Sequence, residues 1–352
     1  MTTLRGHLTM KTFTLPPPRM SRRVFLAASV TAPLGVKSPF AQTQDQPVDP
    51  ATLKPGEFSW KPERSPEGPV VILVSIPKQW VVIYRNGVQI AASTCSTGRP
   101  GHRTPAGVFV ILEKDKNHRS STYDNAPMPY MERLTWGGVA LHAGNLPGYP
   151  ASHGCVRLPL EFAKLLFGVT TLGTPVVMAD GDVVATDFQH PGLLISHHLE
   201  EMAREAVKTV AAKSAHPVSA TKETHQASSF VVSTADRKLI AFINGNEAFT
   251  APIGIEDPEK PFGTHAFTLT GPDDDPAHLK WLAFGLSAGT SQVAASALLA
   301  AETVKRIDLA PEVAKRMTSL LHPGSTLVVT DAPAGDETRT SHGFAILTRE
   351  DT

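Results

Sequence analysis

The chain has 352 residues, which is long enough for two domains that each bury a hydrophobic core. Its 33 basic and 33 acidic residues balance, so no net charge attracts it to nucleic acid or to an anionic membrane surface. Thirty prolines, 26 glycines and only 19% charged residues favour a mainly β, loop-rich globular protein over a helical bundle.

Residues 1–41 have the pattern of an export signal. Arg22 and Arg23 stand directly before an apolar run over 24–36, which is too short to cross a bilayer comfortably. Paired arginines in this position resemble a twin-arginine signal. Prolines and a glycine in and after the run would break the buried helix that is the alternative interpretation. We therefore expect a protein of the periplasm or cell envelope, and no later segment is apolar for long enough to span a membrane.

An extended linker is expected to lead into a first β-rich domain. Residues 42–69 contain six prolines among polar residues, a composition that favours extended chain. From residue 70 onward apolar and polar residues alternate, and Asn86-Gly87 provides the tight turn of a hairpin. We expect this domain to occupy residues 70–181.

A helix and a polar linker are expected over 182–229, between this domain and the rest of the chain. Met202, Ala206 and Val210 recur on one face of the segment 198–213, and this spacing predicts an amphipathic helix. Polar residues follow the helix up to Ser229 and predict a linker.

Residues 230–349 repeat the pattern of the first domain and predict a second, degenerate copy of the same β fold. Ser75 and Ser233 lie 158 positions apart, and so do the glycines of the two hairpin turns, Gly87 and Gly245. Because ordered matches continue past the hairpins, a chance likeness of two hairpins does not account for them. These matches pair 105–107 with 261–263, 134–144 with 279–289 (Trp136 on Trp281), 160–164 with 311–315 and 172–180 with 323–331.

The second copy lacks the reactive side chains of the first. The matches place Arg306 opposite Cys155, Val304 opposite His153 and Ser287 opposite His142. A repeat that keeps its strands and loses these three groups indicates that they serve chemistry and not the fold.

The stretch around Cys155 carries the residues of a cysteine nucleophile. A thiol with a pKa near 8.5 is ionised to only a few per cent at neutral pH, so it needs a neighbouring base. His142 ends a predicted strand, and Cys155 follows 13 positions later, after a loop rich in glycine and proline that can fold back. Gly154 leaves the backbone beside the sulfur free to form an oxyanion hole, and Arg157 offers a planar donor for a carboxylate.

His142, the motif "SHGCVR" at 152–157 and the upstream "STG…TPAGVF" at 96–109 resemble the L,D-transpeptidases, the YkuD-type cell-wall enzymes. The resemblance covers about residues 70–181. It implies an L,D-transpeptidase-like β-sandwich with short helices as the catalytic domain, here followed by the degenerate copy.

The resemblance also implies the role of each residue in the motif. Cys155 would be the nucleophile and His142 the general acid and base, with the backbone carbonyl of Ala143 orienting the imidazole. His153 would line the site and stabilise the sulfur or the oxyanion. The residues expected to contact substrate are Ser152, Gly154 and Arg157.

The implied reaction is acyl transfer on peptidoglycan. Cys155 attacks the third residue of a stem peptide, releases the terminal D-alanine and forms a thioester. An amine then resolves the thioester, which gives a 3-3 cross-link when the acceptor is a second stem peptide. A lipoprotein and a free D-amino acid are the other acceptors considered, and no cofactor is implied.

Several other interpretations stay open at this stage. Water could resolve the thioester, which would make the protein an L,D-carboxypeptidase or endopeptidase, or the chain could be a non-catalytic wall-binding protein. Zinc on His142, His153 and Cys155 lacks an evident fourth ligand, so we expect no metal. A disulfide between Cys95 and Cys155 would block the nucleophile, and Cys95 fits a buried strand thiol better.

The remaining histidines and tryptophans are assigned to the fold. Trp80 and Trp136 are expected in the core, because both fall in alternating segments, and Trp60 either stacks on a sugar or covers an exposed edge. The "SHGF" at 341–344 is treated as a coincidence, since Phe344 replaces the nucleophile. The histidines expected at the surface or in turns are His265, His278 and His342.

Overall fold

The computed structural model describes residues 46–121, 125–181, 185–190, 200–214, 228–244, 246–273, 278–285, 302–334, 339–340 and 344–345. The expected export signal lies outside these residues, as do Ser287 and His342. No helix in the described part of the chain is long and apolar enough to cross a membrane. The expectation of a mainly β protein with short helices is confirmed.

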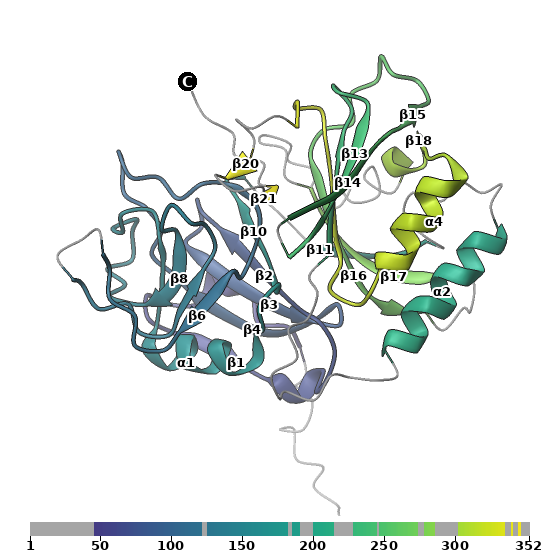
Figure 1. Ribbon diagram of the computed structural model, residues 1–352. Coiled ribbons are helices and arrows are strands. Elements are labelled where there is room, and N and C mark those ends of the chain that lie inside the picture. The colour runs from purple at the N-terminus through teal and green to yellow at the C-terminus, as the bar shows by residue number, and fades with distance from the viewer. Residues whose placement is uncertain are drawn as a thin grey trace, which may run out of the picture. The chain divides into compact units, whose positions relative to one another are not determined.

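A six-stranded sheet in the order β1-β4-β3-β2-β10-β5 forms the frame of the first half (Figure 1). β2 and β10 are parallel, and the other neighbours are antiparallel. The β3–β4 hairpin turns at Asn86-Gly87, both with positive φ, as a type I′ turn requires. The strands are β1 (Phe58–Trp60), β2 (Val70–Ser75), β3 (Trp80–Arg85), β4 (Val88–Thr94), β5 (Gly107–Val110) and β10 (Pro175–Ala179).

β2 is buried along its whole length and does not alternate between buried and exposed residues. Ile72 belongs to the core cluster that includes Phe162 of α1 (Leu160–Val169), whereas Val71 belongs to a cluster that also contains Val231 and Phe284 of the second half. A strand that is covered on both faces is apolar at every position, which explains the run "VVILV".

A smaller sheet in the order β6-β7-β8-β9 carries His142, Ala143 and Arg157, and the turn directly before β9 holds the other predicted site residues. β8 and β9 are parallel neighbours, and β7 pairs antiparallel with both β6 and β8. Helix α1 begins two residues after β9 and packs Phe162 and Leu166 into the first core. The strands are β6 (Glu113–Asp115), β7 (Met131–Arg133), β8 (Ala140–Ala143) and β9 (Val156–Leu158).

Part of the segment expected to be an extended linker belongs to the first sheet. β1 pairs with β4, and the ring of Trp60 lies 5.7 Å from that of Phe162 in an edge-on arrangement. Trp60 therefore covers the edge of the core. Two short 3-10 helices, Pro50–Thr52 and Pro62–Arg64, flank the strand. Apolar side chains at 58 and 60, on one face of a strand, explain why the linker prediction was wrong here.

A seven-stranded sheet in the order β11-β17-β16-β19-β12-β13-β14 forms the second half. Helices α2 (Glu200–Ser214) and α4 (Pro311–Leu320) lie side by side in Figure 1, and Lys213 of α2 donates to the carbonyls of Ser319 and Leu321. The strands are β11 (Ala185–His190), β12 (Ser228–Ser233), β13 (Lys238–Ile243), β14 (Asn246–Pro252), β16 (His265–Pro272), β17 (Leu279–Gly285) and β19 (Thr326–Thr330). Short pairs are β15 (Gly254–Ile255) with β18 (Ile307–Asp308) and β20 (Arg339–Thr340) with β21 (Phe344–Ala345).

The helix predicted between the two domains corresponds to α2. Ala206 and Val210 lie in the core of the second half, on the face that the spacing predicted. The strand β11 was not predicted from the segment 182–229, and it pairs with β17 at the edge of the second sheet.

The two large sheets share their central strand order, β4-β3-β2-β10-β5 in the first and β14-β13-β12-β19-β16 in the second. The pair Leu73–Val177 in the first sheet has the counterpart Val231–Val328 in the second. A register shift follows Ile83 in one hairpin and Ala241 in the other, again 158 positions apart. This agreement supports the proposed duplication.

The structure changes two of the matches between the copies. Val108 and Ala266 occupy equivalent places, opposite Val177 and Val328, so the offset here is 158 and not the expected 156. Trp281 is buried in β17, whereas Trp136 lies in a turn and is 51% exposed. The prediction that Trp136 belongs to the core was therefore wrong, because the chain reverses after β7 where β17 continues straight.

His265 was also assigned incorrectly. It is only 3% exposed, and its Nε2 lies 2.8 Å from the carbonyl oxygen of Phe262. Burial lowers the pKa of this imidazole, so it is held neutral in the core of the second half. Trp80 is half-buried at the start of β3 and packs on the cluster that contains Val71.

Candidate active site

The pairing of β8 with β9 brings His142 and Cys155 into one cavity. His142 of β8 is paired with Arg157 of β9, and Cys155 directly precedes β9. Parallel strands need a crossover connection, and the glycine- and proline-rich segment 144–155 provides it. All three side chains line a cavity of about 520 Å³, together with Ser120, Ala126, Pro127, Met128, Pro129, Ala143, Gly144, Asn145, Ser152, His153 and Leu160.

The imidazole of His142 is held with a lone pair available for proton transfer. Its Nδ1 lies 2.8 Å from the backbone carbonyl oxygen of Ala143. Because a carbonyl oxygen only accepts, Nδ1 carries the proton and Nε2 is left as the basic atom. Burial lowers the pKa of His142 to about 4, with Arg157 acting in the same direction. His142 is therefore a neutral imidazole at physiological pH.

Cys155 is a neutral thiol in the same state of the protein. Its Sγ donates to the carbonyl oxygen of Gly138 at 3.4 Å. Burial raises the pKa of this thiol, while a backbone contact with Ala140 and the charge of Arg157 oppose the rise. Within the described residues no hydrogen bond joins Sγ to the His142 ring, so the resting pair is thiol and imidazole and not a preformed ion pair.

The turn 152–155 is tightened by the hydroxyl of Ser152. Its Oγ donates to the carbonyl of Cys155 at 2.5 Å and accepts from the backbone N–H of Gly154 at 3.1 Å. Gly154 has a φ of 111°, which a residue with a side chain rarely adopts. Ser152 was predicted to contact substrate and Gly154 to supply an oxyanion donor. The structure shows that both groups also shape the turn, and their contact with substrate stays a prediction.

The loop 97–104 fastens this turn from the other side. The backbone N–H of Arg99 donates to the carbonyl of Ser152 at 3.0 Å, and the N–H of Ser152 donates to Thr97 at 3.0 Å. The hydroxyl of Thr104 donates to the carbonyl of Gly154 at 2.9 Å. The "STG…TPAG" stretch contains these residues and contributed to the family resemblance, but the sequence analysis gave none of them an individual role.

His153 is exposed at the edge of the cavity. Its Nε2 lies 2.9 Å from Nη2 of Arg99, and its ring centroid lies 4.8 Å from that of His102. Desolvation, followed by the proximity of Arg99, His102 and Arg157, lowers the pKa of His153. The contact with Arg99 was not foreseen from the sequence.

The position of the Arg157 side chain depends on Gly144, which the sequence analysis did not single out. A Cβ on Gly144 would lie 2.9 Å from Cγ and 3.0 Å from Cδ of Arg157. The hydrocarbon stem of Arg157 therefore crosses directly over the backbone of residue 144, and this close approach directs its guanidinium into the cavity.

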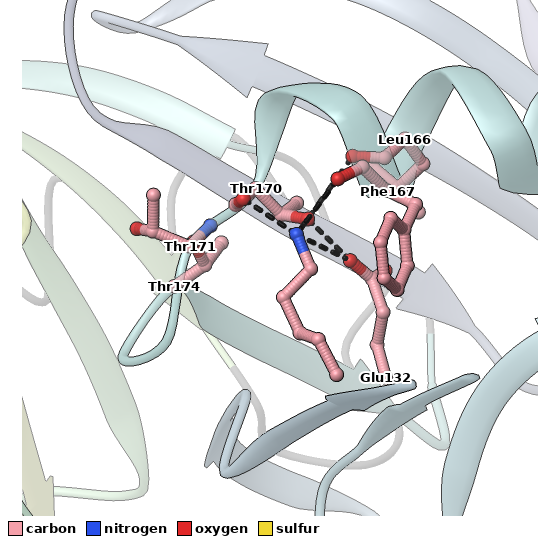
Figure 2. Close-up of polar contacts among 7 residues, drawn as sticks. Glu132, Leu166, Phe167, Thr170, Thr171 and Thr174 are labelled. Carbon is pink, nitrogen blue, oxygen red and sulfur yellow. Dashed lines mark hydrogen bonds and ion pairs between the residues drawn. The ribbon is translucent and has the colours of Figure 1, made fainter. Parts of the chain in front are cut away.

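A buried charged cluster fixes the strands behind the site (Figure 2). Nζ of Lys114 on β6 donates to the carbonyls of Phe167 and Thr170 at the end of α1, at 2.7 and 2.6 Å. Glu132 on β7 is 1% exposed, lies 3.6 Å from Nζ and accepts from the hydroxyl of Thr170. Burial raises the pKa of Glu132 to about 7, against the effects of Thr170 and Lys114. Since Glu132 pairs with Leu141, the cluster joins α1 to the strand of His142.

Neither a disulfide nor a metal cluster occurs among the residues that the structure describes. Cys95 is buried beside β4, and burial raises the pKa of its thiol, so it is an inert core residue.

Residues 69–178 match the family model YkuD, the L,D-transpeptidase catalytic domain. An L,D-transpeptidase from Mycobacterium tuberculosis H37Rv is 25% identical over 32% of this chain and 58% of that chain, with a TM-score of 0.31. An L,D-transpeptidase from Stackebrandtia nassauensis is 26% identical over 32% of this chain and 55% of that chain, with a TM-score of 0.29. An L,D-transpeptidase from Xylanimonas cellulosilytica is 26% identical over 32% of this chain and 61% of that chain, with a TM-score of 0.30. The matched part thus spans less than two thirds of each of these solved chains, and no curated protein sequence matches. The resemblance drawn from the "SHGCVR" motif is confirmed for the first half of the chain.

Proposed function

We propose, from the premise that residues 69–178 are an L,D-transpeptidase catalytic domain, that this protein transfers acyl groups of peptidoglycan stem peptides through a thioester on Cys155. One observation carries the proposal: the β8–β9 pairing places Cys155 and the basic Nε2 side of His142 in a single cavity. Reactive groups in one shaped cavity, with pKa values displaced from their usual range, are the pattern of a catalytic site.

The first step forms the thioester. Nε2 of His142 takes the proton of the Cys155 thiol while Sγ attacks the carbonyl carbon of the third stem residue. The tetrahedral intermediate then loses the terminal D-alanine, because the carbon–nitrogen bond breaks and Nε2 returns the proton to the leaving amine. Both groups start neutral, so proton transfer accompanies the attack and does not precede it.

The second step transfers the acyl group. An acceptor amine attacks the thioester carbon, Nε2 takes its proton, the carbon–sulfur bond breaks and the sulfur recovers the proton. A second stem peptide as acceptor gives a 3-3 cross-link, and water gives hydrolysis. We assign the backbone N–H of Cys155 as the donor to the oxyanion, because it has no partner among the described residues whereas that of Gly154 already donates to Ser152.

Incubation of the protein with muropeptides that carry a tetrapeptide tests the reaction. We expect dimers joined between two third-position residues, seen by mass spectrometry, and none with the variant Cys155→Ala. Trimmed monomers in place of dimers would make the protein a hydrolase. Unchanged products with Cys155→Ala would overturn the thioester and favour a wall-binding role.

We also infer that the enzyme works in the periplasm or cell envelope. The twin-arginine pattern over 1–41 supports this location, as does the proposed substrate, which lies outside the cytoplasm. A fusion of residues 1–41 to a reporter that is active only after export tests the signal. Loss of reporter activity on changing Arg22 and Arg23 to lysine is the expected result.

A further inference from the structure

Basic side chains gather around the turn that carries Cys155, and one of them, His153, lines the cavity. Arg99, His102 and His153 form a contiguous group, with 2.9 Å between Nη2 of Arg99 and Nε2 of His153 and 4.8 Å between the two imidazole rings. Arg157 lines the same cavity. In the part of the chain that the structure describes, neither Arg99 nor Arg157 forms an ion pair with a carboxylate.

The hydrogen bond between Arg99 and His153 fixes the protonation of the imidazole. A guanidinium only donates hydrogen bonds, so Nε2 of His153 must accept and the ring is neutral. Arg99 and Arg157, both positively charged, act on His153. Arg99 is thus held in place without being neutralised, and its remaining N–H groups are available to an anion.

The backbone also holds this group at a fixed distance from the nucleophile. The N–H of Arg99 donates to Ser152, and the N–H of His102 donates to Arg99, so the loop moves together with the turn that carries Cys155. His153 is two residues from Cys155, which places the two Cα atoms at most about 7 Å apart.

We propose that Arg99 and His153 form a subsite for a free α-carboxylate. In the first step the subsite binds the carboxylate of the terminal residue that leaves the donor, and in the second step it binds the carboxylate of an amino-acid acceptor. This inference rests on the proposed function. The carboxylate of a terminal amino acid is three bonds from the carbonyl carbon attacked by Sγ, so it falls within about 4–5 Å of that carbon. Leaving group and acceptor are both α-amino carboxylates bonded through nitrogen to the same carbon, and they therefore use the same subsite.

The subsite predicts which substrates are accepted. A donor must end in a free carboxylate directly after the scissile bond, and a donor that is amidated or extended by one residue there loses the contact. A charge-assisted pair of this kind changes rates by about 10- to 100-fold. Acceptor amines that lack an adjacent carboxylate lose a similar factor.

The experiment compares two donors, a tetrapeptide with a free C-terminal carboxylate and the same peptide as its C-terminal amide. Formation of the acyl-enzyme on Cys155 is followed by mass spectrometry. We expect the wild-type protein to prefer the free acid by at least about tenfold, and Arg99→Gln to remove the preference by slowing the acid alone. Capture of the thioester by D-alanine and by D-alaninamide should show the same pattern.

Two controls separate the subsite from general effects. Arg103→Gln removes one positive charge from the same loop and should keep the preference. Alkylation of Cys155 by iodoacetamide, which has no carboxylate, should proceed at the wild-type rate in Arg99→Gln if the turn is intact. Arg99→Lys keeps the charge but loses the planar fork, and we expect it to retain part of the preference.

Each result decides between distinct conclusions. Equal acylation by acid and amide in the wild-type protein overturns the subsite and leaves the thioester mechanism standing. An equal loss with both donors in Arg99→Gln, or loss of the preference in Arg103→Gln, also overturns it. No acyl-enzyme with either donor removes the proposed function, and this inference with it.

Discussion

The two halves of the chain differ at the position of the proposed nucleophile. The bridge between Ser96 and Arg157 in the first half has the counterpart Gly254–Asp308 in the second, so Cys155 corresponds to Arg306. Cys155 opens onto a cavity. The guanidinium of Arg306 instead donates to three carbonyls of the loop after β15, those of Glu256, Asp257 and Lys260, and lies 3.9 Å over the ring of Phe262.

This difference shows how one strand frame supports a reactive site in one place and a closed loop in another. Equivalent strands keep their pairing and register, while the residues on the connecting loops decide whether a cavity exists. An arginine that binds the carbonyls of this loop stabilises the second half.

The largest effects should come from the two equivalent residues themselves. Cys155→Ala should lower acyl transfer by about 10⁴-fold or more, because it removes the nucleophile, with little effect on stability. Arg306→Ala should leave activity within about twofold and reduce the free energy of unfolding by about 1–3 kcal/mol, because three carbonyls lose a charged donor. Product assays and urea unfolding of both variants measure the contrast. A large loss of activity in Arg306→Ala would show that the second half takes part in the reaction.

His142 should control the reactivity of Cys155 through an unusually low pKa. We expect the rate of alkylation of Cys155 to rise to a plateau as the pH passes about 4, because His142 becomes able to accept the thiol proton there. A second rise follows at alkaline pH, where the thiol itself ionises. His142→Ala should lose the plateau and about 10²-fold in acyl transfer. A first inflection near 6.5 would contradict the burial of the imidazole.

In each half, a lysine binds the C-terminal carbonyls of a helix, Lys114 at the end of α1 and Lys213 at the end of α4. Loss of each lysine should lower the stability by a different amount. Lys114→Met leaves Glu132 buried without its partner and should cost about 3–5 kcal/mol of unfolding free energy. Lys213→Met removes a more exposed contact at the end of α4 and should cost about 1–2 kcal/mol. Glu132→Gln combined with Lys114→Met should recover much of the loss, and equal losses in the two lysine variants would contradict the charge effect.

Glu132 also gives a direction for the pH dependence of stability. Its pKa is raised in the folded state, so the protonated form favours folding. Its contribution is present below the unfolded pKa of about 4.3 and is lost as the pH rises through about 7. Thermal unfolding of the wild type and of Glu132→Gln between pH 5 and 8 measures this, and we expect the stability of the wild type relative to the variant to fall with increasing pH.

The smallest effect concerns Gly144. Gly144→Ala should displace the stem of Arg157 and weaken substrate binding by about 3- to 10-fold, seen as a higher KM with kcat little changed. Arg157→Ala should have a similar effect, and the double variant should be no worse than either one alone. Additive losses would show that the two residues act separately.

The sequence by itself determined the hairpins and the helix α2, and it singled out the two residues, His142 and Cys155, that the structure brings into one cavity. These features depend on patterns within a few residues, such as the Asn-Gly turns, the spacing of Ala206 and Val210, and the stretch around Cys155. It failed where an alternating pattern was taken for a strand, at Trp136, and where a histidine among polar neighbours was taken for a surface residue, at His265.

Only the tertiary structure decided the states of the groups in the site. The neutral thiol and imidazole, the role of Ser152 in the turn, the contact of Arg99 with His153 and the buried pair of Lys114 with Glu132 all join segments that the fold brings together. Burial and hydrogen bonding set these states, and both depend on which distant strands and loops close around each side chain.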